Sequence, residues 1–255
     1  MNEISSVSAD STPPGRALVT GASSGIGAAT VRTLCAAGWT VTAVARRADR
    51  LEDLAHETGC QVVVMDVTNR ESVATLGSST PFDLVVNNAG LGRAMGALWE
   101  ATDDDIDRTI DTNVTAVINV VRAVVPGMIE RKRGHLVNMS SVAGLYPMPA
   151  ALYGATKGAV RRLSQNLRHE LQGTGLRVTE ICPGRVTTEF YDVALDDPGA
   201  AAEAKNTGIT EVTPDDVANA VLYAVSAPWR VNVGTIEITP TEQTYGGGQF
   251  SPVIT

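Results

Sequence analysis

Paired cysteines, clustered histidines and long apolar runs are all missing from this sequence. Its three cysteines and three histidines are scattered over 255 residues. Without CxxC or paired-histidine spacing no metal site is expected, and the cysteines are interpreted as reduced core residues of a cytoplasmic protein. No apolar run approaches the ~18 residues that a membrane helix requires, so no membrane partner is expected.

An excess of basic residues is missing as well. The chain has 28 acidic residues against 20 lysines and arginines, a formal net charge of −8. Nucleic acids need a basic face, so no nucleic-acid partner is expected, although a local arginine cluster is still able to bind a small anion. With 44% hydrophobic residues, the chain is able to bury a sizeable core as one α/β domain.

The two ends of the chain differ from the part between them. Residues 1–14 are polar and rich in Ser, Thr and Pro. They lack the apolar segment of a secretory signal, and we expect a disordered arm. Residues 15–245 show no repeat and no linker, and we expect a single catalytic domain there. Residues 246–255 are glycine-rich and then apolar, and we interpret them as a tail that docks on a neighbouring subunit.

Short β-branched segments alternate with longer stretches of helical periodicity. Strands are predicted at 17–20, 40–44, 61–66, 83–86, 135–140, 176–182 and 235–239, and helices at 25–37, 49–58, 69–76, 103–130, 150–172 and 214–226. Near-continuous apolar strands with helical crossovers predict a doubly wound parallel sheet of about seven strands, covered on both faces. The one long irregular stretch, residues 189–211, is expected to be a lid.

A glycine-rich segment, TGASSGIG at residues 20–27, joins the first strand to the first helix. Its spacing is G-x-x-x-G-x-G, but the mechanics match those of a dinucleotide-binding loop. Gly21 turns the chain off the strand, Gly25 lets the backbone approach a phosphate, and Gly27 lets the helix pack close to the sheet. A pyrophosphate would lie at the helix N-terminus. A turn without a ligand is the alternative, and the strand-loop-helix context argues against it. The predicted contacts are Gly21, Ser23, Ser24, Gly25, Ile26 and Gly27.

Two arginines follow the second strand. A site for NAD places a carboxylate there to accept a hydrogen bond from the ribose 2′-OH, but this segment reads Ala45-Arg46-Arg47, with no acidic residue before Asp49. Arginine suits a 2′-phosphate through planar, charge-assisted donors. A solvated arginine pair at a helix start is the alternative, yet cations are unfavourable there. The pair therefore predicts NADP as cofactor.

Tyr153 and Lys157 form Y-x-x-x-K inside a predicted helix. The i, i+4 spacing places both side chains on one face. A neighbouring lysine cation stabilises a phenolate and lowers the pKa of the phenol. A phenol so tuned takes a proton from an alcohol or donates one to a carbonyl oxygen.

Several further motifs accompany this pair in a fixed order: Asn87-Asn88-Ala89-Gly90, Asn113, Asn138-Met139-Ser140-Ser141 and Pro183-Gly184. Together with the glycine loop and Y-x-x-x-K, they resemble the short-chain dehydrogenase/reductase family over about residues 15–241. The resemblance implies a single Rossmann-like domain with a seven-stranded parallel sheet. Ala45-Arg46-Arg47 and residues 238–243 are similar to the NADP-preferring branch of 3-hydroxy acid, serine and clavulanate-type dehydrogenases.

The resemblance also implies roles for single residues. Tyr153 would be the general acid/base, Lys157 would bind the nicotinamide ribose, Ser141 would hold the substrate oxygen, and Asn113 would hold a water in a proton relay. Further cofactor contacts would come from Asp66 and Val67 at the adenine, from Asn88, Ala89 and Gly90, and from Pro183, Gly184, Val186 and Thr188. Ser141 lies twelve residues before Tyr153, where the family more often has thirteen. Ser141 is favoured over Ser140 because the second serine of such a pair is the usual catalytic one.

The implied reaction is hydride transfer between NADP(H) and a small secondary alcohol or its carbonyl, such as a hydroxy acid or an amino alcohol. Pocket walls are expected from Leu145, Tyr146, Met148, Phe190 and Tyr191, and Arg185 either meets a substrate carboxylate or pairs with Glu189. The alternatives are a catalytically silent NADP-binding regulator, a sugar-nucleotide epimerase and a structural module. Apolar residues on the two longest helices, and the family's habit of pairing them, imply a homodimer or homotetramer.

Overall fold

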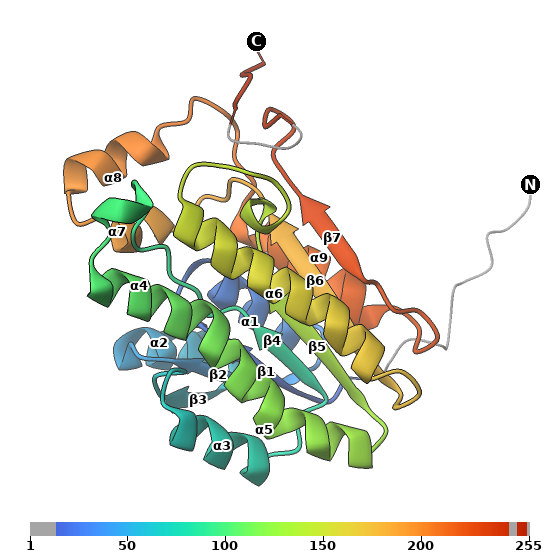
Figure 1. Ribbon diagram of the computed structural model, residues 1–255. Helices are drawn as coiled ribbons and strands as arrows, with labels where there is room; N and C mark the ends of the chain where they lie inside the picture. Colours follow the sequence, from blue (N-terminus) through green and yellow to red (C-terminus); the bar gives the residue numbers. More distant parts are fainter. Residues whose placement is uncertain (1–13, 245–248, 254–255) are drawn as a thin grey trace, which may run out of the picture.

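The computed structural model describes residues 14–244 and 249–253 (Figure 1). The expected N-terminal arm, apart from Pro14, lies outside the described residues. So do residues 246–248 and 254–255 of the expected tail. The described part of that tail turns back along the chain: Gln243 and Phe250 form an antiparallel bridge, and the Ser251 N–H donates to the Glu242 carbonyl over 2.8 Å.

Seven parallel strands form one sheet in the order β3-β2-β1-β4-β5-β6-β7. The strands are β1 (Arg16–Thr20), β2 (Thr40–Ala45), β3 (Gln61–Val64), β4 (Leu84–Asn87), β5 (Gly134–Met139), β6 (Leu176–Pro183) and β7 (Thr235–Ile238). The order reverses beside β1, between β2 and β4, where a doubly wound sheet opens a crevice at the carboxyl ends of its strands. The predicted fold class is confirmed.

Helices cover both faces of the sheet, and those of one face stand in front of it in Figure 1. The helices are α1 (Gly25–Ala36), α2 (Ala48–Thr58), α3 (Arg70–Ser79), α4 (Asp103–Ile110), α5 (Ala116–Glu130), α6 (Ala151–Glu170), α7 (Phe190–Ala194), α8 (Pro198–Lys205) and α9 (Pro214–Ser226). Buried side chains of α1, α2 and α9 share one core cluster. Those of α3, α5 and α6 share the other.

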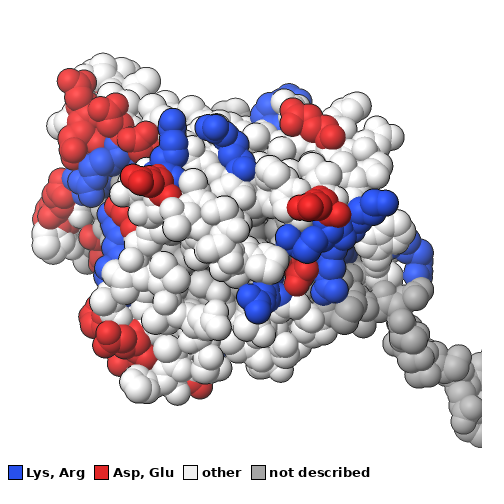
Figure 2. Space-filling model, turned by 90° about the horizontal axis from the view of Figure 1, so that it is seen from below, with Lys and Arg blue, Asp and Glu red and all other residues white. Residues whose placement is uncertain are grey.

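Acidic and basic side chains mix on the surface. On the face drawn in Figure 2, blue and red groups lie beside one another around a broad uncharged area. On this face the basic side chains do not form the extended basic surface that phosphate backbones attract.

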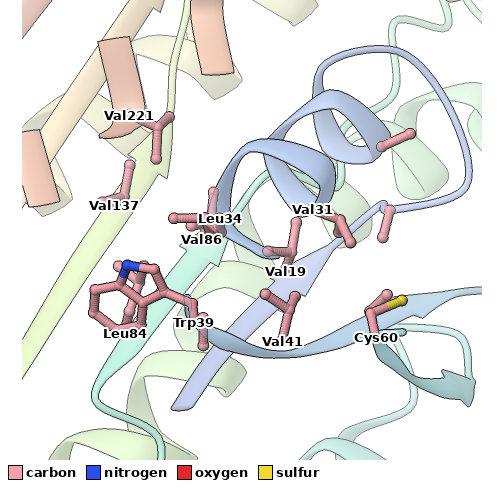
Figure 3. Packing of buried hydrophobic residues seen from close by; sticks show 14 of the residues in the cluster. Val19, Val31, Leu34, Trp39, Val41, Cys60, Leu84, Val86, Val137 and Val221 are labelled. Atoms are coloured by element: carbon pink, nitrogen blue, oxygen red, sulfur yellow. The ribbon is translucent and has the colours of Figure 1, made fainter. Parts of the chain in front are cut away.

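Adjacent strand residues point into opposite cores. Val19 and Val86 belong to the cluster under α1 and α9, whose packing Figure 3 shows. Their neighbours Leu18 and Val85 belong to the cluster under α5. A parallel sheet covered on both faces needs apolar residues at every strand position, which explains the near-continuous apolar runs.

The predicted helix over residues 103–130 is continuous but irregular. A π-helical segment, Asp111–Thr115, separates α4 from α5. In the described part of the chain, Asp103–Glu130 is the one helical span long and apolar enough to cross a membrane, by length and composition alone. In its most apolar window 44% of the residues are buried inside the domain, and core helices of soluble proteins meet the same criterion.

The stretch expected to be irregular, residues 189–211, contains two short helices, α7 and α8. The Asp197 side chain accepts a hydrogen bond from Gly199 N–H, and Pro198 occupies the first turn of α8. A capping residue followed by proline is a helix-start signal that the composition of this stretch had obscured. The same signal at Thr213 and Pro214 correctly predicted the start of α9.

Candidate active site

A cavity of about 680 Å³ opens at the carboxyl ends of the strands, a volume suited to a small-molecule or cofactor ligand. Nearly all the site residues predicted from the sequence line it. They are Gly21, Ser23, Ser24, Gly25, Ile26, Arg46, Arg47, Asp66, Val67, Asn88, Ala89, Gly90, Ser141, Tyr153, Lys157, Pro183, Gly184, Val186 and Thr188. Gly27 and Asn113 lie behind this wall, among neighbours described below.

The glycine loop has the backbone that its glycines predict. Gly21 and Gly25 have φ of 66° and 50°, in the left-handed region that favours glycine. A Cβ on Gly27 would lie 2.2 Å from the Gly21 carbonyl oxygen, so only glycine lets α1 start this close to β1. The Ser24 side chain does not cap α1, and its first turn has no acidic residue. The N–H groups of that turn are therefore suited to an anion.

The end of β4 is tied to the end of β1 beside this loop. The Thr20 hydroxyl accepts hydrogen bonds from the backbone N–H groups of Asn88 and Ala89, over 3.0 and 3.1 Å. The Asn88 amide donates to the carbonyl oxygens of Thr20 and Gly21, over 3.0 and 3.2 Å. These bonds fix the floor of the cavity where the sheet order reverses.

The predicted arginine pair lies at one end of the cavity. The Arg47 guanidinium donates to the hydroxyls of Ser23 and Ser24, over 3.0 and 2.6 Å, which orients it along the glycine loop. Arg46 lies 3.8 Å from the Asp66 carboxylate. The two arginines therefore flank the glycine loop and the end of β3, where a 2′-phosphate beside an adenine would lie.

Tyr153 and Lys157 lie one turn apart on α6 and share the far end of the cavity. The Lys157 ammonium donates to the Met139 carbonyl over 2.9 Å and lies 5.7 Å from the centre of the Tyr153 ring. Burial lowers the pKa of Lys157 to about 8. This ammonium is therefore largely shielded from solvent and lies beside the aromatic ring, with the Met139 carbonyl as hydrogen-bond acceptor.

The pKa of Tyr153 departs from the expected direction. Burial raises it to about 12, and a hydrogen bond with the Ser141 side chain only partly opposes that rise. The pKa of this phenol is therefore raised and not lowered as expected, because desolvation is the largest cause of its shift. The phenol therefore keeps its proton at neutral pH and is able to donate it.

The structure separates the two neighbouring serines. The Ser140 hydroxyl donates to the Lys157 backbone carbonyl over 3.1 Å, which ties β5 to α6. The Ser141 hydroxyl donates to the Pro183 carbonyl over 3.4 Å, lines the same cavity as Tyr153 and lowers the pKa of that phenol. Ser141 is therefore the serine placed beside the reactive phenol, despite the twelve-residue spacing.

Asn113 lies in the π-helical segment and is 1% exposed. Its side chain accepts from the Leu91 N–H and donates to the Leu91 carbonyl, both over 2.7 Å, and donates to the Thr156 hydroxyl over 3.0 Å. A Cβ on Gly90 would lie 3.4 Å from the Lys157 nitrogen and 3.6 Å from the Asn113 oxygen. Gly90 therefore keeps open the space between these two polar groups.

The lid supplies aromatic walls. The Phe190 ring lies 5.4 Å from the ring of Tyr153 and 5.3 Å from that of Tyr191. Met148 also lines the cavity, as expected, whereas Leu145 and Tyr146 do not. The Tyr146 hydroxyl instead donates to Glu237 over 3.0 Å, because the turn after β5 directs it toward β7.

Arg185 pairs with Glu211 over 2.7 Å and lies 4.3 Å from the centre of the Tyr191 ring. The expected alternative, a pair with Glu189, is wrong, because the Glu189 carboxylate pairs with Arg47 and Arg50. Sequence reasoning missed Arg50 and the cavity-lining Gln243 and Phe250. Arg50 lies one turn into α2 after the arginine pair, a signal that was present in the sequence.

Comparisons with known proteins agree with the resemblance seen in the sequence motifs. Residues 16–198 match the family described as short chain dehydrogenase. The chain is 40% identical over 239 residues to NADP-dependent 3-hydroxy acid dehydrogenase YdfG of Escherichia coli strain K12, covering 90% of this chain and 96% of that protein. It is 37% identical over 243 residues to serine 3-dehydrogenase of Rhizobium radiobacter, covering 92% and 97%.

Solved structures agree with these relatives. The closed form of serine dehydrogenase complexed with NADP+ superposes with a TM-score of 0.87 at 39% identity, covering 92% of this chain and 98% of that one. A metagenomic short-chain oxidoreductase in complex with NADP gives 0.76 at 28% identity, covering 89% and 97%. The resemblance read from the sequence motifs is confirmed, and the chain belongs to the short-chain dehydrogenase family.

Proposed function

We propose that this protein is an NADP-dependent oxidoreductase that interconverts a secondary alcohol and the corresponding carbonyl compound, with Tyr153 as general acid/base. One observation carries the proposal. A single cavity is lined by a glycine loop, an arginine pair and the side chains of Tyr153, Ser141 and Lys157. The relatives named for NADP-dependent 3-hydroxy acid and serine dehydrogenation support the same class of reaction.

The described residues fit a dinucleotide with a 2′-phosphate. The first turn of α1 and the left-handed glycines suit the pyrophosphate, and the arginines at the end of β2 suit the 2′-phosphate. Asp66 and Val67 line the cavity at the end of β3, where the adenine would lie. Thr188 and Val186 line the opposite wall, near Gly25.

The bound cofactor supplies or accepts the hydride, and the chain supplies position and one proton. With a pKa near 12 the Tyr153 phenol stays protonated at neutral pH and donates its proton to a carbonyl oxygen. The Ser141 hydroxyl, which lines the cavity with that phenol, would hold the same oxygen as negative charge develops on it. The Lys157 ammonium, fixed on the Met139 carbonyl, adds positive charge beside the phenol when Tyr153 gives up its proton.

Asn113 is proposed to support this proton transfer as a positioning residue. Its oxygen and the Lys157 nitrogen flank the space over Gly90, which suits a water that connects them. Leu91 and Thr156 satisfy the rest of the Asn113 amide, so its orientation is fixed.

The substrate end of the cavity is mainly apolar. Met95, Met148, Phe190, Val193 and Phe250 line it. Arg185 already has the Glu211 carboxylate as a partner. We therefore propose a small secondary alcohol, with a hydroxy acid and an amino alcohol among the substrates to be tested.

A coupled screen tests the proposal: a panel of alcohols with NADP and NAD, and of ketones with NADPH and NADH. We expect turnover with at least one secondary alcohol or ketone, and a lower KM for the phosphorylated cofactor. Tyr153→Phe should lower that turnover at least about a hundredfold and keep cofactor binding. Binding of NADPH without turnover of any compound would instead indicate a silent NADP-binding regulator.

A cytoplasmic homodimer or homotetramer is the assembly that we propose. Ile110, Ile118 and Ile129 on the long helical span α4–α5 are 39–40% exposed, so an apolar strip remains on its outer side. Helices of this kind bury such strips against a second copy. Light scattering at micromolar concentration should give at least twice the 26.7 kDa mass of the chain. A monomer would contradict this part of the proposal.

A further inference from the structure

Glu189 directly precedes α7 and is far from α2 in the sequence, yet its carboxylate bridges two arginines at the start of α2. One Glu189 oxygen accepts from Arg47 over 3.1 Å, and both oxygens accept from Arg50, over 2.7 and 2.8 Å. The three side chains are 39–44% exposed. Charge-assisted hydrogen bonds from Arg50 and Arg47 lower the pKa of the Glu189 carboxyl. An anion therefore occupies the arginine cluster, and it belongs to the chain itself.

The position of this anion matters because of what else surrounds Arg47. Two of its donors are used by the hydroxyls of Ser23 and Ser24 in the glycine loop. A third donor, on Nη1, points to Glu189, and so does the Arg50 guanidinium one turn further along α2. A 2′-phosphate at the end of β2 would need these same donors, since two guanidinium groups on one oxyanion is the arrangement that phosphate prefers.

We infer that Arg50 completes the binding site for the cofactor 2′-phosphate, and that Glu189 competes with the phosphate for Arg50 and Arg47 and so sets the affinity for NADP. This inference rests on the proposed function. A phosphate monoester carries about 1.5–2 negative charges near pH 7 and three acceptor oxygens, so it displaces a carboxylate from the two arginines. The 2′-hydroxyl of NAD carries no charge and leaves Glu189 in place.

The competition also connects the two ends of the cavity. Thr188, directly before Glu189, lies so close to the glycine loop that a Cβ on Gly25 would be 3.2 Å from its methyl group. Phe190, directly after Glu189, begins α7 and packs 5.4 Å from the Tyr153 ring. Glu189 thus stands between Thr188, which faces the cofactor loop, and Phe190, which faces the reactive tyrosine. When a 2′-phosphate displaces the Glu189 carboxylate, the lid loses its ion pairs at this connecting residue.

Binding of two fragments tests the inference without catalysis. Adenosine 2′,5′-bisphosphate and 5′-AMP differ only in the 2′-phosphate, and calorimetry gives a dissociation constant for each. In Glu189→Gln the bisphosphate should bind about two- to fivefold more tightly than in the wild type, the range expected for loss of an exposed ion pair, while 5′-AMP binds unchanged. Asp192→Asn is the matched control, because it removes an acid of the same lid that pairs with Lys205 instead.

Arg50→Ala tests the other half of the site. Loss of a charge-assisted contact should weaken the bisphosphate about tenfold and leave 5′-AMP unchanged. Arg32→Ala is its control, since Arg32 is also exposed but pairs with Glu57 and not with Glu189. Glu189→Ala serves as a second variant at the lid position and should repeat the effect of Glu189→Gln.

The outcomes separate this inference from the proposed function. If the wild type binds the bisphosphate no more tightly than 5′-AMP, the choice of NADP and this inference both fail. If the wild type prefers the bisphosphate but Glu189→Gln leaves that preference unchanged or weakens both fragments, Glu189 is not a competitor and the inference alone fails. If Arg50→Ala affects neither fragment, Arg50 is not part of the phosphate site.

Discussion

Replacing Lys157 by methionine should make the protein more stable while it destroys the activity. Lys157 is only 5% exposed, and its ammonium has one hydrogen-bond acceptor, the Met139 carbonyl. Removing a charged group from water is unfavourable, and here burial dominates the lowered pKa. Methionine has a similar length and fills the space of the lysine stem without a charge.

The size of the effect follows from linkage. The pKa of Lys157 falls from 10.5 in the unfolded chain to about 8 in the folded one. Each pKa unit corresponds to ~1.4 kcal/mol of folding free energy, so keeping the ammonium protonated in the folded protein costs about 3 kcal/mol. Loss of the hydrogen bond to Met139 removes about 1 kcal/mol of the gain. The free energy of unfolding of Lys157→Met should therefore exceed that of the wild type by about 2 kcal/mol at pH 7.

The stability difference between Lys157→Met and the wild type should also change with pH. Between the folded pKa near 8 and the unfolded pKa of 10.5, the unfolded lysine still holds a proton that the native one has lost. Wild-type stability therefore rises with pH over this window, while the variant has no such contribution. The advantage of Lys157→Met should be full below pH 8 and shrink toward pH 10.5.

Urea unfolding of both proteins at one protein concentration, from pH 6.5 to 10, measures this difference. Lys205→Met, at an exposed lysine of the lid, is the control and should change stability by less than about 0.5 kcal/mol. A variant less stable than the wild type at pH 7, or an advantage that does not change with pH, would refute the reasoning that burial strains this lysine.

Further expectations concern the chemistry. Tyr153→Phe should lower turnover by about 10²–10⁴ with cofactor affinity kept, whereas Tyr223→Phe, at a 69% exposed ring, changes neither. Ser141→Ala should lower turnover by about 10²–10³, and Ser140→Ala should mainly lower stability, by about 1 kcal/mol; the reverse order contradicts the assignment. Because the Tyr153 pKa is near 12, initial rates of alcohol oxidation should rise with pH from 7 to 10; a maximum at neutral pH argues for another base. Arg47→Ala should raise the KM for NADPH about tenfold and that for NADH little.

The sheet was predictable because its signals are local. Each strand is short and rich in β-branched or other apolar residues, and the residues after the strands carry the glycine loop and the arginine pair. The π-helical segment at Asp111–Thr115 had no such signal. It depends on tertiary contacts that hold Asn113 against Leu91 and Thr156, and periodicity alone gave one regular helix.

Contacts between distant charges could not be read from the sequence. Glu189 is 139 residues from Arg50, and Arg185 meets Glu211 although Glu189 lies nearer in the chain. Which acid an arginine selects depends on how the lid folds back over the sheet. Motif reasoning also treated the tyrosine and lysine as an isolated helical pair. It therefore considered the charge of Lys157 and left out the desolvation that dominates the pKa of Tyr153.

The same burial that strains Lys157 requires a rigid frame around it, and hydrogen bonds to two places along α6 provide one. The Ser140 hydroxyl donates to the Lys157 carbonyl, Asn113 donates to the Thr156 hydroxyl, and Asn138 donates to the Ser164 hydroxyl over 2.9 Å. All three donors come from β5, from the residue after it, or from the π-helical segment. Because these bonds are buried, loosening any of them leaves an unpaired polar group, so α6 cannot shift to relieve the lysine. The strain at the site is thus maintained by the polar contacts that hold its reactive phenol in place.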